Sequence, residues 1–508
     1  MNVNGQEIAE ARYRMANLWQ FKGKIQQAMK GYRETLLLSP DYTPARLELG
    51  NLLIKQGDIG AAIKLYREAM AMSPKETIFQ EKLQCLLNNQ TVYGGDDSNE
   101  FRATAWPESE GSSRNGRILL YTDSPGVYGA GQCNHLLMTQ LAEKGYHCTF
   151  AQPKAHHHLI EARQALGIKQ VWIEHDDLYD MAGEHRSLWD DAEALKIFAN
   201  QKPDLIIFSD GCPVSNLAAK AAAGRMGIPY VVVVHCVTAS WAIQFSEHLE
   251  TLHHVYCKAA RVVAVSTDNL SLLREWFHLP IYQGEVLHNG VAERFFAPFD
   301  ISMREQVRQD LGVPLDGVVS LTVGRMETVK GYQYQLRAIE RLKKSEVWPR
   351  LYFAWAGTGT MEPRLRAWAR RLGVEGHIKF LGERDDISDV LNAADMFVLT
   401  SQFEGMPLSI AEAMAKGLPV AASGISGIPE ELGHTGMLLS DPSKDSDALI
   451  SQLAETIQSW AANPEIRRTV GRECKKRAED LFKMEHSFQK YLRHIEQVLV
   501  EHKSGFQK

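Results

Sequence analysis

Cysteine is scarce in this sequence, and long apolar runs are missing from it. The 508 residues include seven cysteines, an odd number, and no two of them form a Cys-x-x-Cys pair. A disulfide framework is therefore not expected, and we predict reduced, mostly buried cysteines. The longest apolar stretch, around Val231–Val234, is far too short to span a bilayer. The first residues lack the apolar run of a signal peptide, so we expect a cytoplasmic protein without a transmembrane segment; peripheral membrane contact stays open.

Neither sign of charge dominates the chain. It has 56 basic and 62 acidic residues, which gives a formal net charge of -6. This balance argues against a protein that binds nucleic acid through an overall positive charge, and we expect no nucleic-acid partner. Hydrophobic residues make up 44% of the chain. At this length we expect about three domains, each able to bury its own core.

The amino-terminal part contains an internal repeat with an offset of 34 residues. The matched positions include Ala11 and Ala45, Ala28 and Ala62, Tyr32 and Tyr66, and Ser39-Pro40 and Ser73-Pro74. This period and pattern resemble the tetratricopeptide repeat. We therefore predict a small all-α module over residues 1–90, in which a third, partial unit from Phe79 acts as a cap. Each helix pair needs a neighbour to cover its apolar face, and the array could bind a protein partner.

Residues 91–116 are polar and rich in Gly, Ser, Asp and Asn, which predicts a linker. Beyond them, short apolar runs alternate with helical stretches, which is typical of parallel α/β sheets. The predicted strands of the first series are 117–122, 146–151, 204–209, 230–234 and 262–265. Those of the second series are 318–323, 351–356, 378–381, 396–399, 419–422 and 436–439.

These two series predict two consecutive Rossmann-like domains, over residues 117–298 and 299–475. They would face a cleft, because ligands of such sheets bind outside the carboxyl ends of the strands. The last segment, 476–508, contains an amphipathic pattern that predicts one long helix from about 478 to 500. This helix could return to the first α/β domain.

The most informative segment is residues 401–417, with the sequence SQFEGMPLSIAEAMAKG. A strand is expected to end near Ser401, and a helix to begin near Leu408. The free N–H groups of Leu408 and Ser409 would then face the cleft, where a helix N-terminus is suited to bind a diphosphate. Glu404 lies in the turn before this helix and Glu412 lies inside it. One carboxylate can reach a sugar while the other reaches a ribose hydroxyl.

The Glu404 and Glu412 pair, with seven residues between them in EGMPLSIAEAMAKGLPV, resembles the retaining family 4 glycosyltransferases. These enzymes have the GT-B fold of two Rossmann-like domains. The resemblance implies that Glu404 contacts the donor sugar and Glu412 the ribose of the nucleotide. Gly405, Met406 and Pro407 would form the turn that binds the donor. The alternative is two solvated carboxylates at a helix start.

A second motif, Val323–Gly331, follows a predicted strand and resembles the turn of the same family whose basic residues hold the diphosphate. The resemblance assigns this role to Arg325 and Lys330, beside Gly324. As the glycosidic bond breaks, the leaving diphosphate gains negative charge, which two fixed cations would stabilise without a metal ion. The alternative is a surface turn with two solvated cations.

Weaker matches complete the second α/β domain. Gly357 lies in a tight glycine loop after a strand, where a plain turn is nearly as well supported as a ligand contact. Leu381 and Arg384 lie where the family holds the nucleotide base. Asp395 is interpreted as structural. Glu430 follows a later strand and is a further site candidate.

The first α/β domain should hold the acceptor. Its first strand leads into a glycine-rich turn with Gly129 and Gly131, but Tyr128 occupies the position where the family usually has a first glycine. His235 ends a strand, and the family often has a histidine of the cleft there. A neutral imidazole could bind a hydroxyl of the sugar or of the acceptor, although a satisfied core histidine is the alternative. Asn289 lies in a turn interpreted as structural.

No cofactor and no metal site are expected. The histidines at 156–158 lack the spacing of a metal site and predict a solvated loop. The resulting prediction is a metal-independent, retaining hexosyltransferase that uses a nucleotide-diphosphate sugar, with UDP favoured, and an unknown glycan, lipid or protein acceptor. Two other functions remain open. One is a catalytically weak protein that binds a nucleotide sugar and recruits a partner through its repeats, and the other is a nucleotide-sugar epimerase.

Overall fold

The computed structural model divides the chain into two compact units, Met1–Gly111 and Ser112–Lys508. It describes residues 9–10, 12–17, 19, 24–55, 59–72, 79, 83, 116–124, 126, 128–155, 157–174 and 185–505. Several residues used for the sequence predictions lie outside this set: Ala11, Ser73, Pro74, His156 and the predicted linker up to Asn115. The two units are described separately below.

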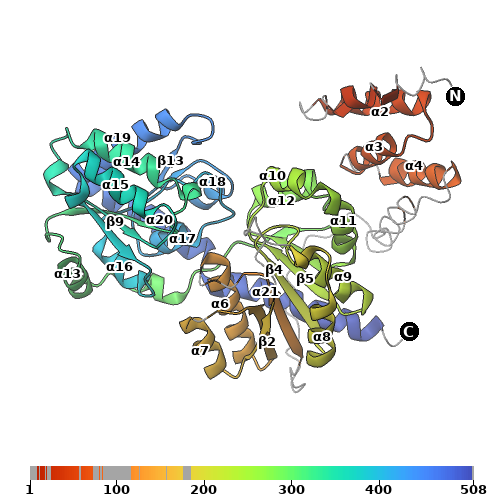
Figure 1. Ribbon diagram of the computed structural model, residues 1–508, viewed down its shortest axis with the longest axis horizontal. Coiled ribbons are helices and arrows are strands. Elements are labelled where there is room, and N and C mark those ends of the chain that lie inside the picture. Colours follow the sequence, from red (N-terminus) through yellow and green to blue (C-terminus); the bar gives the residue numbers. More distant parts are fainter. Residues whose placement is uncertain are drawn as a thin grey trace, which may run out of the picture. The chain divides into compact units, whose positions relative to one another are not determined.

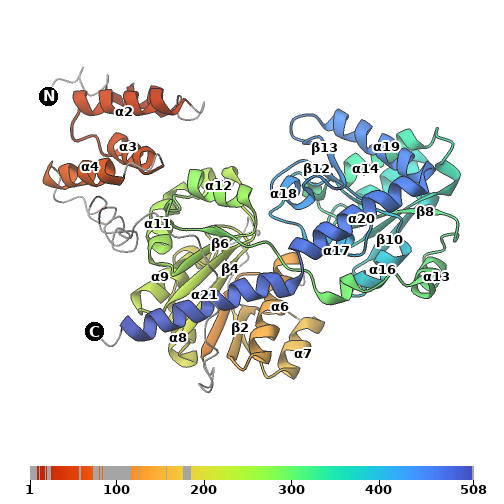
Figure 2. The same ribbon diagram turned by 180° about the vertical axis from the view of Figure 1, so that it is seen from behind.

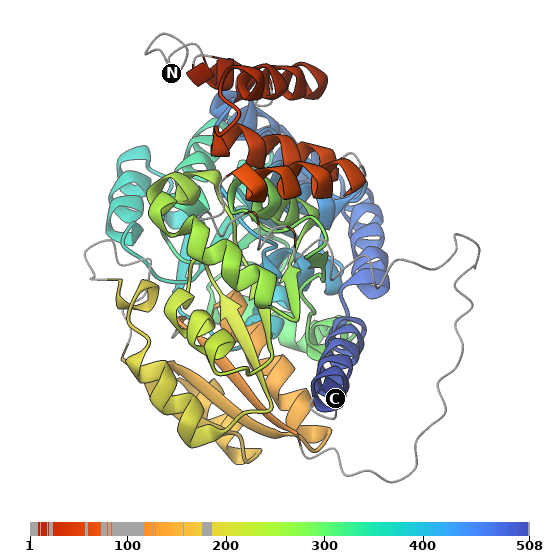
Figure 3. The same cartoon turned by 90° about the vertical axis from the view of Figure 1, so that its right-hand side faces the viewer.

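The first unit contains three described helices, α2 (Ile25–Leu38), α3 (Thr43–Lys55) and α4 (Ile59–Met72). α3 packs against both neighbours (Figure 3). Two of the residue pairs that match across the 34-residue repeat are buried in one core, Ala28 with Ala62 and Tyr32 with Tyr66. Gly50 lies directly against the Tyr66 ring, so a side chain would not fit there. Helices and a shared core are what the repeat predicts, whereas the assignment to the tetratricopeptide class stays a prediction.

The second unit begins with a seven-stranded parallel sheet. Its strands are β1 (Arg117–Thr122), β2 (His147–Pro153), β3 (Lys169–Ile173), β4 (Leu205–Asp210), β5 (Tyr230–Val234), β6 (Arg261–Ala264) and β7 (Glu285–Val286). Their order in the sheet is β3-β2-β1-β4-β5-β6-β7. Three of these strands, β2, β4 and β5, are labelled in Figure 1. The chain thus runs outward from β1 and then restarts at β4 on its other side. The carboxyl ends of β1 and β4 therefore form the switch point where such sheets bind ligands.

Helices cover both faces of this sheet, and the strands are apolar on both sides for that reason. In β4, Ile206 and Phe208 face one core while Leu205 and Ile207 face the other. The first core is completed by α8 (Ala192–Gln201), α9 (Leu217–Arg225), α11 (Leu249–Lys258) and α12 (Thr267–Trp276). The second is completed by α6 (Gly129–Glu143) and by α21 (Met484–Gly505), which crosses α6 and contacts it (Figure 2). Shorter helices are α7 (His158–Ala165) and α10 (Ala239–Gln244).

A six-stranded parallel sheet forms the second α/β domain. Its strands are β8 (Val318–Val323), β9 (Leu351–Ala356), β10 (Ile378–Gly382), β11 (Met396–Leu399), β12 (Val420–Ser423) and β13 (Met437–Leu439), in the order β10-β9-β8-β11-β12-β13. One face packs against α16 (Ile387–Ala393), α17 (Leu408–Ala415) and α20 (Pro464–Leu481). The other packs against α14 (Tyr332–Leu342), α15 (Glu362–Leu372) and α19 (Ser446–Ala462). Two helices complete the domain, α13 (Ile301–Asp310) and α18 (Ile428–Leu432). The two parallel sheets confirm the predicted Rossmann-like class.

The long helix predicted from about 478 to 500 is present as α21 (Met484–Gly505), but it begins later than predicted. α20 ends at Leu481 and α21 begins at Met484. Between them Lys483 forms an isolated β-bridge with Val291, whose N–H donates to the carbonyl of Phe482 (2.7 Å) and whose carbonyl accepts from the N–H of Met484 (3.0 Å). Backbone hydrogen bonding to a distant segment therefore interrupts the helix. α20 packs on the second α/β domain and α21 on the first.

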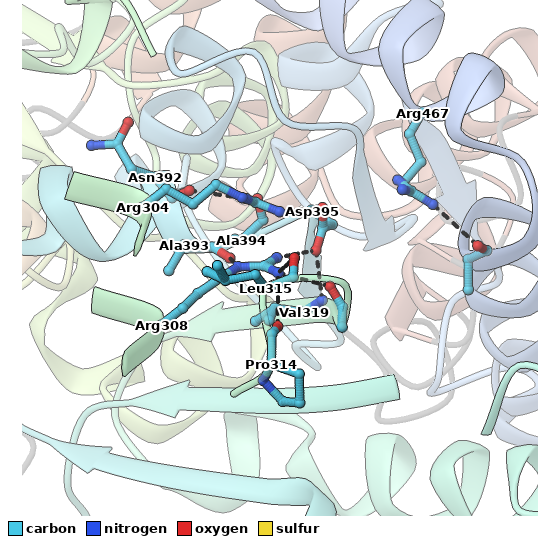
Figure 4. Close-up of polar contacts among 12 residues, drawn as sticks. Arg304, Arg308, Pro314, Leu315, Val319, Asn392, Ala393, Ala394, Asp395 and Arg467 are labelled. Atoms are coloured by element: carbon cyan, nitrogen blue, oxygen red, sulfur yellow. Dashed lines mark hydrogen bonds and ion pairs between the residues drawn. The ribbon is translucent and has the colours of Figure 1, made fainter. Parts of the chain in front are cut away.

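A cluster of buried and half-buried charges at the amino ends of β8 and β11 anchors α13 (Figure 4). Asp395, which precedes β11, accepts from Arg304 Nη2 (2.8 Å), Arg308 Nη2 (2.6 Å) and the N–H of Val319 (2.8 Å). Arg308 is fully buried, and its other donors bind the carbonyls of Ala393, Pro314, Leu315 and Gly317. All of these groups serve the fold, in line with the interpretation of Asp395 as structural.

Candidate active site

The carboxyl ends of the same two strands, β8 and β11, bring Lys330 and Glu404 together. Lys330 Nζ lies 2.5 Å from Glu404 Oε1, and Ser401 donates a hydrogen bond from its hydroxyl to the same oxygen at 2.7 Å. Glu404 is buried and Lys330 is partly buried. Two site residues that were predicted from separate motifs are therefore in direct contact. Ser401 was missed as a site residue, although its position three residues before Glu404 could have suggested it.

Backbone contacts hold the two turns of this pair against each other. Gly331 has a φ of 73°, and its Cα lies so close to the carbonyl of Thr400 that a side chain would not fit. Thr400 donates from its hydroxyl to the Gly331 carbonyl (2.9 Å), and the N–H of Gln402 donates to the Val329 carbonyl (2.7 Å). The position of Lys330 relative to Glu404 is thus set by the main chain.

Helix α17 starts directly after the Glu404 turn. Pro407 has an extended backbone and precedes Leu408, the first helical residue, and no side chain caps this end. The first N–H groups of α17, which include those of Leu408 and Ser409, carry the partial positive charge of the helix dipole. This end of α17 lies beside the Lys330 and Glu404 pair, because only Gly405 and Met406 separate Glu404 from Pro407.

Glu412 lies one turn into α17 and is half-buried. Burial raises the pKa of its carboxyl to about 8, and the positive charge of Arg294 only partly opposes this effect. No ion pair forms on Glu412 among the described residues. Its carboxyl group is therefore available as a hydrogen-bonding group rather than held as a structural anion.

Arg325 extends from the turn after β8 toward the first α/β domain. Its guanidinium carbon lies 5.2 Å from the centre of the Tyr128 ring, in a cation–π contact. Tyr128 precedes Gly129 and Gly131, which begin α6, and Gly131 lies too close to the carbonyl of Gly126 for a side chain. The residue at which the sequence departs from the family pattern therefore contacts one of the predicted basic residues. No sequence signal indicated this pairing.

The glycine loop after β9 packs on the turn after β8. Gly357 has a φ of 132° and lies directly against the carbonyl of Gly324, where a Cβ would clash. Its N–H donates to the carbonyl of Gly382 at 2.7 Å. Gly324 and Gly357 thus form a side-chain-free wall beside Lys330. The structure gives this loop a packing role; a ligand contact stays a prediction.

The segment predicted to hold the base, Leu381 and Arg384, lies at the end of β10. Leu381 is half-buried. Arg384 Nε donates to Asp386 Oδ1 at 2.7 Å, and this hydrogen bond raises the pKa of the guanidinium. Arg384 is therefore engaged by a neighbouring carboxylate and is not directed at Lys330 and Glu404 by any contact in the described part of the chain.

His235 follows β5 and lies under the Glu404 turn. Its carbonyl contacts Gly405 so closely that no side chain fits at that position, and it also accepts from Asn269 Nδ2 at 3.3 Å. The ring Nε2 lies 3.0 Å from Ser209 Oγ, whereas Nδ1 is buried and has no hydrogen-bond partner among the described residues. Burial lowers the pKa of the imidazole to about 4, so the ring is neutral near pH 7. His235 and the Asn134 side chain line one pocket.

Side chains also join the two α/β domains next to this turn. Glu430 accepts hydrogen bonds from the N–H of Thr267 (2.6 Å), from its hydroxyl (2.9 Å) and from His288 Nε2 (2.7 Å). Asn289 Nδ2 donates to the carbonyl of Met406 at 3.0 Å. Glu430 and Asn289 were noticed in the sequence, but their partners lie more than a hundred residues away and could not be predicted.

Metal-ligand clusters and membrane spans are both missing from the described part of the chain. It contains no group of three or more His, Cys, Asp or Glu side chains that could hold a metal ion. In the predicted histidine loop, His158 is exposed and begins α7. No helix within the described ranges is long and apolar enough to cross a bilayer.

Comparison with known families matches each α/β domain to a glycosyltransferase model. Residues 127–294 match the model described as Glycosyltransferase Family 4, and residues 303–477 match the one described as Glycosyl transferases group 1. A D-inositol 3-phosphate glycosyltransferase of Corynebacterium kroppenstedtii is 34% identical over 178 residues, which are 33% of this chain and 40% of that protein. Mannosylfructose-phosphate synthase of Agrobacterium fabrum is 28% identical over 218 residues, 41% of this chain and 48% of that protein. The alignments thus cover about half of these relatives or less.

Solved structures share the fold at low sequence identity. HepE of Anabaena, in complex with UDP, aligns with a TM-score of 0.62 and 19% identity over 75% of this chain and 100% of that chain. Sucrose-phosphate synthase of Thermosynechococcus elongatus aligns with a TM-score of 0.61 and 20% identity, over 76% of this chain and 100% of that one. The overlap corresponds in extent to the two α/β domains.

Proposed function

The chain belongs to the glycosyltransferases of the group 1 and family 4 type, with the GT-B arrangement of two Rossmann-like domains, and from this premise we propose that it transfers a sugar from a nucleotide-diphosphate donor to an acceptor hydroxyl. The observation that carries the proposal is the Lys330 and Glu404 pair at the carboxyl ends of β8 and β11, next to the start of α17. A cation, a carboxylate and a helix N-terminus at one point are suited to a sugar diphosphate.

In this proposal the diphosphate lies against Lys330, Arg325 and the first N–H groups of α17. These groups are fixed before the reaction and lie where negative charge develops as the glycosidic bond breaks, so they stabilise the leaving group. No metal ion is required for this role. Glu404 changes partner from Lys330 to a hydroxyl of the sugar, and Gly405 keeps this turn free of side chains. Lys330 then neutralises phosphate charge instead of the carboxylate.

We propose that the configuration at the anomeric carbon is retained. The acceptor hydroxyl would attack on the face from which the diphosphate leaves, and a phosphate oxygen would take its proton. His235, neutral because of its burial, would act as a hydrogen-bonding group that positions the sugar or the acceptor and not as a base. Packing of the two domains around the sugar would exclude water, which would otherwise be the acceptor.

The second α/β domain, 299–475, is proposed to hold the nucleotide and the first, 117–298, the acceptor. Glu412 would accept hydrogen bonds from the ribose, with Leu381 near the base. UDP is the favoured nucleotide and a hexose the favoured sugar; the UDP complex of HepE supports this choice of donor at the level of a shared fold. The helical unit is proposed to be a tetratricopeptide-repeat module that binds a protein partner.

The test of the proposal is a thermal-shift panel of nucleotides and nucleotide sugars, followed by transfer from a radiolabelled donor. We expect a uridine or other nucleoside diphosphate to raise the melting temperature of the wild type but not of Lys330→Ala. A donor-binding protein without transferase activity would show the shift without transfer. An epimerase would convert the donor with no acceptor present, whereas a transferase would show only slow hydrolysis. A panel without any shift would contradict the proposal.

A further inference from the structure

Glu430 connects the two α/β domains through three hydrogen bonds to a single carboxylate. The residue lies in α18 of the second domain. Its donors come from the first domain and from the segment that leaves it: the N–H of Thr267 at 2.6 Å, the hydroxyl of the same residue at 2.9 Å, and His288 Nε2 at 2.7 Å. Both oxygens of the carboxylate are engaged.

Thr267 is the first residue of α12, so Glu430 binds the N-terminus of a helix that belongs to the other domain. Within its own domain, Ser266 already caps this helix, because its hydroxyl oxygen accepts from the N–H of Asn269 at 3.2 Å. The N–H of Thr267 is a second donor of the first turn, and the positive end of the helix dipole favours an anion at this place. Hydrogen bonds outweigh the burial of Glu430, which would raise its pKa, and leave that pKa below its usual value.

The main chain at Glu430 also forms hydrogen bonds within its own domain. Arg477, in α20, donates from Nη2 to the carbonyl of Glu430 (2.7 Å) and from Nε to the carbonyl of Glu431 (2.8 Å). The main chain of α18 is thus fixed to the second domain while the side chain binds the first. The position of α18 in the second domain is therefore coupled to the position of α12 in the first.

The hydrogen bonds of Glu430 lie next to the Glu404 turn, which is proposed to bind the sugar. Gly427, three residues before Glu430, donates from its N–H to the carbonyl of Gly405 at 3.1 Å. Gly427 also lies against Ser266, and Gly405 against the carbonyl of His235, too closely for side chains in either place. A displacement of Glu430 from α12 would therefore shift the turn that carries Glu404 relative to His235.

We infer that Glu430 is a positioning residue: together with Thr267 and His288 it docks the second domain on α12 and so holds the Glu404 turn against His235, without contacting the donor. The meaning of this position for catalysis rests on the proposed function, whereas the docking itself does not. Glu430, which the sequence offered as a site candidate, thus receives a positioning role.

The experiment compares Glu430→Ala and Thr267→Val with the wild type by hydrogen exchange in the full chain without ligand. Glu455→Ala, which removes an exposed carboxylate of the same domain in α19, is the matched control. We expect exchange in the first turn of α12 and in residues 404–406 to become about tenfold faster in Glu430→Ala, as expected when hydrogen bonds to one charged group are lost. The effect should be smaller in Thr267→Val, which keeps the backbone donor, and absent in the control.

A second measurement separates positioning from ligand contact. The affinity for UDP should change less than about twofold in Glu430→Ala, while turnover of UDP-glucose should fall about tenfold, because positioning acts on the reacting geometry and not on binding. Unchanged exchange at α12 would overturn the inference, and so would a loss of UDP affinity as large as that of Lys330→Ala. If the wild type neither binds UDP nor turns over UDP-glucose, the choice of donor is wrong, and the exchange data still decide whether Glu430 docks the domains.

Discussion

Strands β8 and β11 carry a charge cluster at each end, and the two clusters differ in how completely their hydrogen bonds are satisfied. At the amino ends, Asp395 binds two arginines and a backbone N–H, and the buried Arg308 uses its remaining donors on carbonyl oxygens. At the carboxyl ends, Lys330 and Glu404 bind each other, and within the part of the chain that the structure describes Ser401 is the one further side-chain partner of the carboxylate.

This difference separates charges that hold the fold from charges that can bind a ligand. A buried ion cluster is tolerable when every donor and acceptor has a partner, and Asp395 meets that condition. A pair with donors to spare can exchange partners when a phosphate and a sugar hydroxyl arrive. The carboxyl ends are also the side of a parallel sheet on which ligands bind. Substitutions at the amino ends should therefore mainly lower stability, whereas substitutions at the carboxyl ends should mainly lower activity.

Asp395→Ala should give the largest effect, and the effect should fall on stability. It leaves the fully buried Arg308 without its anion, a change that costs about 3–5 kcal/mol for a buried pair. Urea unfolding of the full chain, followed by tryptophan fluorescence, measures the loss. Any folded fraction should bind UDP as tightly as the wild type. Stability close to that of the wild type would show that this cluster contributes little to the fold.

Lys330→Ala should reverse this pattern at the other end of the strands. We expect transfer to fall by about 10²-fold or more, the scale of losing one preorganised charge contact, with a smaller loss of stability than in Asp395→Ala. Glu404→Ala should give a similar loss of transfer. Steady-state transfer rates and urea unfolding of the same preparations test both statements. Near-normal turnover in a folded variant would remove that residue from the proposed mechanism.

Most of the sheet architecture could be predicted from the sequence, because central strands buried on both faces appear as uninterrupted apolar runs. β3, with the sequence KQVWI, escaped prediction because it lies at the sheet edge and most of its residues are only partly buried or exposed. β7 has only two residues. The break between α20 and α21 depends on Val291, far away in the chain, and no local pattern encodes it.

At the site, too, features set by local sequence could be predicted, whereas contacts between distant segments could not. Lys330 and Glu404 were predictable because each lies in a local motif that resembles a donor-binding motif of the family 4 glycosyltransferases. The Tyr128 and Arg325 contact and the binding of Glu430 to Thr267 arise from docking of the two α/β domains. Thr267 and Glu430 are 163 residues apart, and neither segment alone specifies its partner. Local chemistry can therefore be inferred from a sequence when the contacts between domains cannot.

Glu412 extends the comparison to a carboxyl group that has no ion pair among the described residues. Its pKa in the folded protein is about 8, raised from 4.5 by burial, so the folded state holds this proton more tightly than the unfolded state does. The free energy of unfolding should therefore decrease as the pH rises between these two values. Glu412→Gln should flatten this part of the pH profile, measured by urea unfolding at several pH values. An identical slope in wild type and variant would show that Glu412 is ionised in the folded protein.

Arg384 should give the smallest effect, because its partner Asp386 is a partly exposed neighbour in sequence. An ion pair of this kind contributes about 0.2–1 kcal/mol, far less than the Asp395 cluster. A double-mutant cycle with Arg384→Ala and Asp386→Ala, measured by urea unfolding, should give a coupling energy in that range. UDP binding to Arg384→Ala adds a functional comparison. A loss of affinity as large as that of Lys330→Ala would mean that Arg384 leaves Asp386 to bind the nucleotide. A charge that has an ion-pair partner in this structure would then bind the ligand, contrary to the distinction drawn between the two ends of β8 and β11.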